Sequence, residues 1–547
     1  MVIASAALWA VVSCVSGPAL ALQSGTPTAW PTDEWERPAP EEEGLSSQAL
    51  AEAVEFAAQQ RDADRFAIHS LAVVRRGRLV LDAYFHPFAP ETLHDVASIT
   101  KSVTSLLIGT ALADDHLARI DLPVSAFFPQ ADGTAWDNVT IQNLLSMRSG
   151  YHYRFEAEAI ATMQTSPHWV DWAVSRTPNG PPGAGWFYNS VDMHMLSALL
   201  QDRVMIDGEA VPTGSYAAAE LFRPLGVTNF AWPADPQGVV HGWGDLRLLP
   251  TDIAKLGMLV LYGGRWEGRN VVAPGYLRES VTPQSEAFFE RELRGAGYGY
   301  LWWVTDEGAV QARGRGGQRL HIDPQRELIV VTTGADGSAD GAVIDELIAD
   351  YITPAVVSDE ELPEDPAGLR RLSDAVSAAA TAPIVSSRPL PSAPAIQQSV
   401  DGKTYRFATN PVGVQRVRFD FSSDTADMRI DLAFAAGPQP GAWMPEAPAD
   451  TAADTGSGAR APDPSGSMRL NVGLDGVYRF GEGRFGIPAR ARGSWADGDV
   501  FIVELDEIGN ISRWSLEAEF SDGGDVLTLV LRERYYDRPP ISITSIP

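Results

Sequence analysis

The sequence predicts an α/β (α+β) domain, in which helices flank an antiparallel sheet and form a helical subdomain, followed by a second domain that is all β. Runs rich in β-branched and aromatic residues occur at 70–84 and again at 299–333, with a mostly helical stretch between them. Strands from both ends of one segment can share an antiparallel sheet on which the intervening helices pack. After residue 399, apolar and polar residues alternate, which is typical of strands with one buried face.

The elements of the first domain are predicted from local patterns. An apolar-periodic stretch at 46–60 predicts a helix, and two β-rich runs at 70–74 and 79–84, separated by Arg76-Gly77, predict a hairpin. Residues 98–290 combine helical patterns with Gly and Pro turns. Further strands are expected at 299–304, 309–313, 318–322 and 327–333, and a closing helix at 341–351.

The second domain is predicted from alternation. Apolar residues alternate with polar ones in 428–434 and 514–520, and Val526, Thr528 and Val530 continue the alternation after an Asp522-Gly523 turn. Residues 445–467, rich in Ala, Asp, Pro, Gly and Ser, predict a flexible insert. Without a catalytic motif, this domain is expected to be an accessory one.

Composition divides the chain into five segments. Residues rich in Pro, Ala, Ser and acidic groups separate the two domains and predict a linker with one short helical piece near 366–380. The predicted segments are a signal peptide at 1–21, a Pro-rich leader at 22–42, the α+β domain at 43–353, the linker at 354–398 and the all-β domain at 399–547.

Charge and hydropathy exclude several kinds of partner. The 547-residue chain is 45% hydrophobic and carries a formal net charge of −29. A nucleic acid or an anionic membrane surface would require a basic face, so the charge argues against both. Beyond the first 21 residues, no apolar run approaches the roughly 20 residues that span a bilayer.

The N-terminal segment predicts export to the periplasm or the extracellular space. Residues 1–21 form an uncharged apolar run that ends in Ala19-Leu20-Ala21, the small-x-small pattern of a signal-peptidase site, although a positive n-region is missing. Val11-Val12-Ser13-Cys14 also resembles a lipoprotein cleavage box, in which case Cys14 would be a lipid anchor. The choice between the two signal peptidases stays open.

Metal, disulfide and cofactor sites have no support in the sequence. Cys14 is the only cysteine, which excludes disulfides, thiolate clusters and a cysteine nucleophile from the mature protein. The nine histidines follow no metal-ligand spacing, and G-x-S-x-G and Gly-rich phosphate loops are absent. We therefore predict neither a metal nor a cofactor.

Lysine usage points to a catalytic pair. The chain contains only three lysines against 39 arginines, and Lys101 lies in Ser98-Ile99-Thr100-Lys101 at the start of an apolar helical run. A spacing of three places both side chains on one helix face. Lysine can lose its proton when buried, whereas arginine effectively cannot. The motif therefore predicts a Ser98 nucleophile with Lys101 as its base.

Two further motifs carry possible chemistry. Tyr188 follows a turn-rich segment, and a phenol can relay protons between a serine, a lysine and a leaving group; the structural alternative is a half-buried Tyr bonded to a carbonyl. Gly314-Arg315-Gly316-Gly317-Gln318 precedes a strand, where glycines allow close approach and a free N–H can serve an oxyanion hole. Its alternative is a glycine-rich hairpin corner.

These three motifs, in this order, resemble the serine β-lactamase and penicillin-binding-protein superfamily over roughly 40–355. Within its class C-like branch they look most like 6-aminohexanoate-dimer hydrolase and related esterases. Further phrases that carry the likeness are Leu144–Gly150, Gly244–Leu248, Leu261–Trp266 and Gly297–Trp303.

The resemblance implies an acyl-enzyme mechanism on a β-lactamase-like fold. Ser98 would be the nucleophile, Lys101 and Tyr188 the proton-transfer pair, and the N–H groups of Ser98 and Gln318 the oxyanion hole. The positions implied to line the substrate are Asn189, Ser190, Arg315, Gly316 and Gly317. Where penicillin-recognising enzymes carry Lys-Thr-Gly, this chain has Arg315-Gly316-Gly317, so the hydroxyl that would bind a β-lactam carboxylate is missing.

The predicted function is that of an exported serine hydrolase that cleaves small amides or esters. One alternative is a β-lactamase or D-Ala-D-Ala peptidase. Another is a catalytically weak binding protein that uses the same cleft. The expected partner is a small-molecule substrate, while oligomeric state and the role of the β domain stay open.

Overall fold

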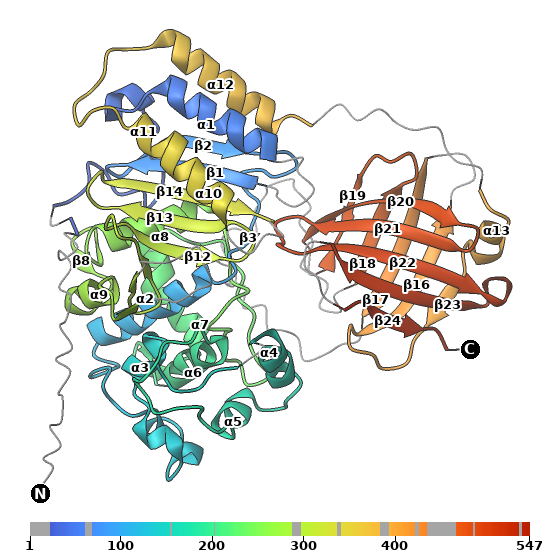
Figure 1. Ribbon diagram of the computed structural model, residues 1–547, viewed down its shortest axis with the longest axis horizontal. Coiled ribbons are helices and arrows are strands. Elements are labelled where there is room, and N and C mark those ends of the chain that lie inside the picture. Colours follow the sequence, from blue (N-terminus) through green and yellow to red (C-terminus); the bar gives the residue numbers. More distant parts are fainter. Residues whose placement is uncertain are drawn as a thin grey trace, which may run out of the picture.

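A computed structural model describes residues 22–23, 25–60, 68–153, 156–201, 203–286, 297–335, 341–382, 393–421, 426–434, 467–484, 487–534 and 539–546. Figure 1 shows two parts side by side, a mixed helix and sheet domain and a domain made of strands. The predicted signal peptide with Cys14, and the predicted 445–467 insert apart from Ser467, lie outside the described residues.

An eight-stranded antiparallel sheet, counted over the described residues, forms the centre of the first domain. Its order is β2-β1-β14-β13-β12-β11-β10-β9, so strands from both ends of the domain are neighbours; for example, Ala72 pairs with Val331. This arrangement confirms the predicted fold class. The strands are β1 (Ile68–Arg75), β2 (Arg78–Tyr84), β9 (Ser285–Glu286), β10 (Gly297–Tyr298), β11 (Trp303–Val304), β12 (Val310–Gly314), β13 (Gln318–Asp323) and β14 (Leu328–Gly334).

Three short two-stranded sheets accompany it in the described residues. They pair β3 (His94–Asp95) with β6 (Arg247–Leu248), β4 (Met205–Ile206) with β5 (Glu209–Ala210), and β7 (Arg265–Trp266) with β8 (Arg269–Asn270).

The predicted strand 299–304 is wrong as a single element. It is replaced by a turn between β10 and β11, in which Gly299 donates from its N–H to the carbonyl of Trp302 at 2.9 Å. Leu301 has a φ of 67°, in the left-handed region that extended strands do not contain. The bend leaves the Leu301 carbonyl to accept a hydrogen bond of 2.6 Å from Ser102 Oγ.

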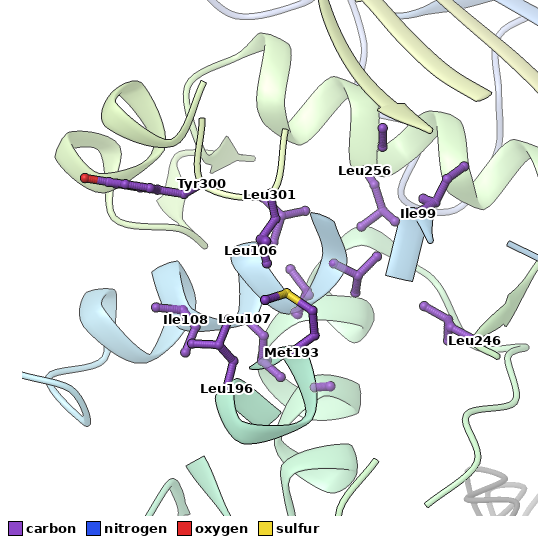
Figure 2. Packing of buried hydrophobic residues seen from close by; sticks show 14 of the residues in the cluster. Ile99, Leu106, Leu107, Ile108, Met193, Leu196, Leu246, Leu256, Tyr300 and Leu301 are labelled. Atoms are coloured by element: carbon purple, nitrogen blue, oxygen red, sulfur yellow. The ribbon is translucent and has the colours of Figure 1, made fainter. Parts of the chain in front are cut away.

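Helix α2 (Ile99–Ala113) is the buried axis of the domain. Every residue from Ile99 to Ala111 is buried, because the sheet lies on one side of this helix and α6 (Ser190–Leu200) on the other. Figure 2 shows Leu106 and Leu107 close to Met193 and Leu196 of α6. The apolar run that follows Ser98 therefore fixes the helix start inside the core.

Other helices cover the two faces of the sheet (Figure 1). On one side lie α8 and the helical subdomain; on the other side lie α1 and α12. The remaining helices are α1 (Ser47–Gln60), α3 (Ile141–Leu145), α4 (Glu156–Gln164), α5 (Trp169–Val174), α7 (Thr213–Tyr216), α8 (Pro250–Leu261), α9 (Pro274–Ser280), α10 (Ala342–Glu346), α11 (Thr353–Ala355), α12 (Pro366–Ala380) and α13 (Ile396–Val400).

Part of the predicted linker packs on the first domain. Helix α12 forms where the 366–380 piece is expected, and its Leu372 and Ala379 are buried in the hydrophobic cluster that includes α1 and β1. Arg371 also pairs with Glu52 and Glu55 of α1.

The second domain is an all-β structure, as predicted. Its ten-stranded sheet, as far as the chain is described, follows sequence order and closes on itself where Ile546 donates to the Arg406 carbonyl at 2.8 Å. The strands are β15 (Thr404–Arg406), β16 (Val414–Phe421), β17 (Asp427–Phe434), β18 (Met468–Gly473), β19 (Arg479–Glu482), β20 (Pro488–Asp497), β21 (Val500–Glu507), β22 (Arg513–Ser521), β23 (Val526–Glu533) and β24 (Ile541–Thr544). The predicted alternation through Val526, Thr528 and Val530 is wrong by one position in β23, because Leu527 and Leu529 are the residues that join the core of this domain.

Among the residues that the structure describes, none of the helices combines the length and the apolar character that crossing a bilayer requires.

Candidate active site

Ser98 lies at the N-cap of α2, where the chain is tightly constrained. The preceding Ala97 has a φ of 48°, and its N–H donates to Asp95 Oδ1 at 2.8 Å. Thr100 Oγ1 donates to the Ala97 carbonyl at 2.6 Å, which holds the bend against the first turn. The Ser98 side chain makes no capping hydrogen bond, so its hydroxyl is available to a side chain one turn along the helix.

Lys101 is that partner. Its Nζ donates to Ser98 Oγ at 2.9 Å and to the carbonyl of Trp243 at 3.0 Å. The residue is only 2% exposed, so the amine is withdrawn from water and oriented by two oxygen atoms. Thr104 Oγ1 reinforces this arrangement by donating to the Gly242 carbonyl at 2.8 Å. The predicted spacing of three thus brings the serine and the lysine together.

Tyr188, from the helical subdomain, contacts the same lysine. Lys101 Nζ lies 4.7 Å from the centroid of the Tyr188 ring, a distance at which a cation and an aromatic face attract each other. The ring stacks on Trp303 with centroids 6.3 Å apart and planes 21° apart. Phe187, just before it, donates from its N–H to the Met147 carbonyl at 3.0 Å. Trp243 and Tyr188, from two distant segments, therefore meet at the lysine that bonds Ser98.

Asn189 and Ser190, the next two predicted positions, begin helix α6. The Asn189 side-chain oxygen accepts from Val191 N at 2.9 Å and from Asp192 N at 3.3 Å, which is an N-cap. Its amide nitrogen donates to the Tyr151 carbonyl at 3.1 Å. Both residues are buried, so in this structure the Asn189 side chain serves to fix the entry of α6 behind Tyr188.

The third motif forms the turn between β12 and β13. Gly316 and Gly317 have φ values of 87° and 85°, which only glycine adopts readily. A Cβ added to Gly314 would lie 2.6 Å from the Val96 carbonyl, so this turn is pressed against the segment that leads to Ser98. Arg315 is exposed at the tip of the turn.

The Gln318 side chain is bound into the sheet. Its Nε2 donates to the carbonyls of Gly334 at 2.5 Å and Gly316 at 3.2 Å, and its Oε1 accepts from Gly334 N at 3.3 Å. These bonds hold the β12–β13 turn to β14. A contribution of Gln318 to catalysis would therefore have to come from its backbone N–H.

A charged group that sequence reasoning missed adjoins the site. Burial and the Asp245 carboxylate raise the pKa of Asp95, against the opposing effect of Arg247 and Arg315. Burial would also raise the pKa of Asp245, but a 2.8 Å hydrogen bond to His241 Nδ1, together with Arg247 and Arg315, holds it below its ordinary value. The positive charge of Arg315 thus acts on two carboxylates near Ser98. The phrase Gly244–Leu248 was the only sequence signal for this group.

Comparison with known proteins agrees with this arrangement. A family model described as Beta-lactamase matches residues 54–353. The 6-aminohexanoate-dimer hydrolase of Paenarthrobacter ureafaciens is 27% identical over 290 residues, which cover 47% of this chain and 70% of that protein.

Two solved structures align at lower identity. A penicillin-binding protein homologue from Caulobacter crescentus is 17% identical, with a TM-score of 0.44 over 60% of this chain and 97% of that one. The octameric penicillin-binding protein homologue from Pyrococcus abyssi is 15% identical, with a TM-score of 0.46 over 90% of this chain and 99% of that one.

The family model covers more than half of the chain and spans the segment that contains Ser98, Lys101, Tyr188 and Gln318. It includes nearly all of the first domain and none of the all-β domain. The resemblance seen in the sequence is thereby confirmed: the chain belongs to the Beta-lactamase family of serine hydrolases.

Proposed function

We propose that this protein hydrolyses small amides or esters through an acyl-enzyme formed on Ser98. The observation that carries the proposal is the 2.9 Å hydrogen bond between Lys101 Nζ and Ser98 Oγ, made by a lysine that is 2% exposed. A serine hydroxyl is a weak nucleophile unless a base next to it removes its proton. A buried amine within hydrogen-bond distance is such a base.

The first half of the reaction forms the ester intermediate. The neutral amine of Lys101 accepts the hydroxyl proton while Ser98 Oγ attacks the substrate carbonyl carbon. Negative charge develops on the carbonyl oxygen, and the N–H groups of Ser98 and Gln318 are the proposed donors to it. The leaving amine or alcohol departs with a proton that is passed on through Lys101 and the Tyr188 hydroxyl.

The second half releases the product. Water attacks the acyl-Ser98 ester, and Lys101 with Tyr188 takes the proton of that water. Collapse of the second tetrahedral intermediate frees the acid and returns the proton to Ser98 Oγ.

The proposed substrate class is supported by the relative and by the third motif. The relative from Paenarthrobacter ureafaciens is named as a hydrolase of the 6-aminohexanoate dimer. Arg315-Gly316-Gly317 lacks the threonine hydroxyl of penicillin-recognising enzymes. Small linear amides and esters therefore fit the proposal better than β-lactams do.

The test is a substrate panel on the full chain. We expect p-nitrophenyl acetate, p-nitrophenyl butyrate or the 6-aminohexanoate dimer to be turned over, Ser98→Ala to abolish turnover, and intact mass to reveal an acyl adduct that Ser98→Ala lacks. Ser105→Ala is the matched control, because Ser105 lies on the same helix with its hydroxyl bonded to Tyr276 at 2.8 Å. Turnover unaffected by Ser98→Ala would refute the proposal, and nitrocefin turnover equal to ester turnover would favour a β-lactamase.

We also propose that the protein is exported, on the strength of the Ala19-Leu20-Ala21 pattern. N-terminal sequencing of protein from the native host is expected to begin at Leu22, or to give a blocked, lipid-modified Cys14. A mature chain that still begins at Met1 in the cytoplasm would contradict export.

A further inference from the structure

A turn of the all-β domain reaches the segment that leads to Ser98. This turn, residues 508–512, connects β21 to β22, and the carbonyl of Gly509 accepts a hydrogen bond of 2.9 Å from Asp95 N. A Cβ added to Gly509 would lie 2.2 Å from the Leu93 carbonyl. The two backbones therefore approach more closely than any residue except glycine would allow.

The turn has a defined shape of its own. Asn510 N donates to the Glu507 carbonyl at 3.0 Å, and Gly509, the third residue of this four-residue turn, has a φ of 82°, as a type II turn requires. Asn510 Nδ2 also donates to Glu507 Oε2 at 2.9 Å. The tip of the turn is thus fixed by hydrogen bonds within the β domain before it contacts the first domain.

Charged residues of both domains interact with Glu507 at the base of the turn. Burial would raise the pKa of Glu507, but Arg484, by charge and by hydrogen bonds, and Arg247 of β6 hold it below its ordinary value. Arg247 belongs to the same charged group as Asp95 and Asp245. The base of the turn is therefore electrostatically linked to the surroundings of Ser98.

Ile511 of the β domain lies on the third motif, at Gly316. A Cβ added to Gly316 would lie 3.0 Å from Ile511 Cγ2, so this side chain rests on the Gly316 backbone, and Gly316 is buried. Ile508 and Ile511 are 6% and 3% exposed, yet neither belongs to the hydrophobic cluster of the β domain. An apolar side chain contributed by the other domain is thus placed on the turn between β12 and β13.

We propose that Ile511 is a specificity-determining residue that closes the substrate cleft at the Gly316 end and limits the length of the apolar chain that can lie there. This inference rests on the proposed function for its substrate class. Gly316 contributes no hydroxyl at this end, and the charge of Arg315 acts on Asp95 and Asp245. A short, uncharged part of a substrate is therefore the part that we expect to meet Ile511 at Gly316, and in this proposal the β domain takes part in substrate selection.

The kinetic test compares short and long acyl chains. We expect Ile511→Ala to raise the ratio of kcat/KM for p-nitrophenyl octanoate to that for p-nitrophenyl acetate about tenfold, the low end of what one methylene contributes in an apolar pocket. Ile546→Ala, which removes the same atoms from a residue that is 48% exposed, should leave the ratio unchanged. A ratio that stays within twofold in Ile511→Ala would overturn the proposal.

A second variant moves the whole turn. Gly509→Ala places a Cβ against the Leu93 carbonyl and should shift the ratio in the same direction as Ile511→Ala. Gly523→Ala is its matched control, because Gly523 has a similar φ of 67°, lies in another turn of the same domain and has nothing within 4 Å of an added Cβ. Equal effects of the two glycine substitutions would show backbone strain alone and would count against the proposal.

A binding measurement separates this proposal from the proposed function. Butanone and 2-octanone carry a carbonyl but no leaving group, so their dissociation constants can be measured by calorimetry whether or not Ser98 is the nucleophile. We expect Ile511→Ala to strengthen 2-octanone binding about tenfold relative to butanone. Unchanged relative affinity, or no binding of 2-octanone to either protein, would refute the role of Ile511, whereas turnover that survives Ser98→Ala would refute only the proposed function.

Discussion

The carbonyl of Trp243 accepts a hydrogen bond of 3.0 Å from Lys101 Nζ, across 142 positions of sequence. This bond and the one to Ser98 Oγ leave the amine little freedom to turn away from the serine. The Tyr188 ring lies on a third side, 4.7 Å from the nitrogen. A residue that only filled space in the core would not need three polar or aromatic partners around its terminal atom.

The first prediction concerns the identity of this base. In Lys101→Arg the guanidinium stays protonated and cannot accept the hydroxyl proton of Ser98, so kcat on p-nitrophenyl esters should fall by about 10²–10⁴-fold, the range that general bases contribute. Lys403→Arg is the matched control, because Lys403 pairs with Asp525 in the β domain. Ester turnover that survives in Lys101→Arg would show that another group removes the serine proton.

The second prediction separates the Tyr188 hydroxyl from its ring. Tyr188→Phe keeps the stacking on Trp303 and the contact with the lysine, so KM should change little, while kcat should fall about 10²-fold through loss of the proton relay. The control is Tyr300→Phe, whose hydroxyl bonds Gln142 at 2.8 Å. Equal kcat values for the two variants would contradict a relay through Tyr188.

The sequence allowed much of this site to be predicted because its signals are local. A spacing of three in a helix fixes the separation of Ser98 and Lys101, and the apolar run behind them fixes their burial. The family match spans the segment that contains the remaining motifs. The sharing of one antiparallel sheet by strands from both ends of the domain was also predictable, because β-rich runs occur at both ends of the segment with helices between them.

What could not be predicted depends on contacts between distant segments. Nothing local to Asp95 indicates that Gly509 of the other domain lies against it, and nothing near Ile511 points to Gly316. The turn that interrupts 299–304 was missed because β-propensity does not reveal the left-handed conformation of Leu301. Backbone conformation at single residues and docking between domains are tertiary properties that sequence patterns leave undetermined.

The third prediction tests how closely the β12–β13 turn must approach Ser98. Gly314→Ala puts a Cβ 2.6 Å from the Val96 carbonyl, which must push the turn or the Ser98 segment aside. A displacement of about 1 Å typically costs about 10²-fold in rate, so kcat/KM for esters should fall by that amount. Gly275→Ala, with nothing within 4 Å of its added Cβ, should behave as wild type. Full activity of Gly314→Ala would show that this contact does not position the site.

The last prediction concerns acid stability and depends on His321 in β13. The side-chain oxygen of Gln311 already accepts from Arg313 Nε at 2.6 Å and from Arg319 Nη1 at 3.2 Å, so its NH₂ group must face His321 Nδ1, 2.8 Å away. Nδ1 therefore accepts a hydrogen bond and His321 is neutral. Burial and the nearby Arg319 charge lower its pKa from 6.5 to about 4.

The unfolded chain binds this proton below about pH 6.5, whereas the folded chain binds it only near pH 4. The free energy of unfolding therefore decreases as the pH falls from about 6.5 to about 4. The shift corresponds to about 3 kcal/mol. His321→Asn keeps an acceptor for Gln311 but has no proton to take up. Urea unfolding at pH 7, 6, 5 and 4 should therefore show a loss of stability in wild type that exceeds the loss in His321→Asn by about this amount. Parallel stability curves for the two proteins would mean that His321 takes up its proton as easily in the folded state as in the unfolded chain.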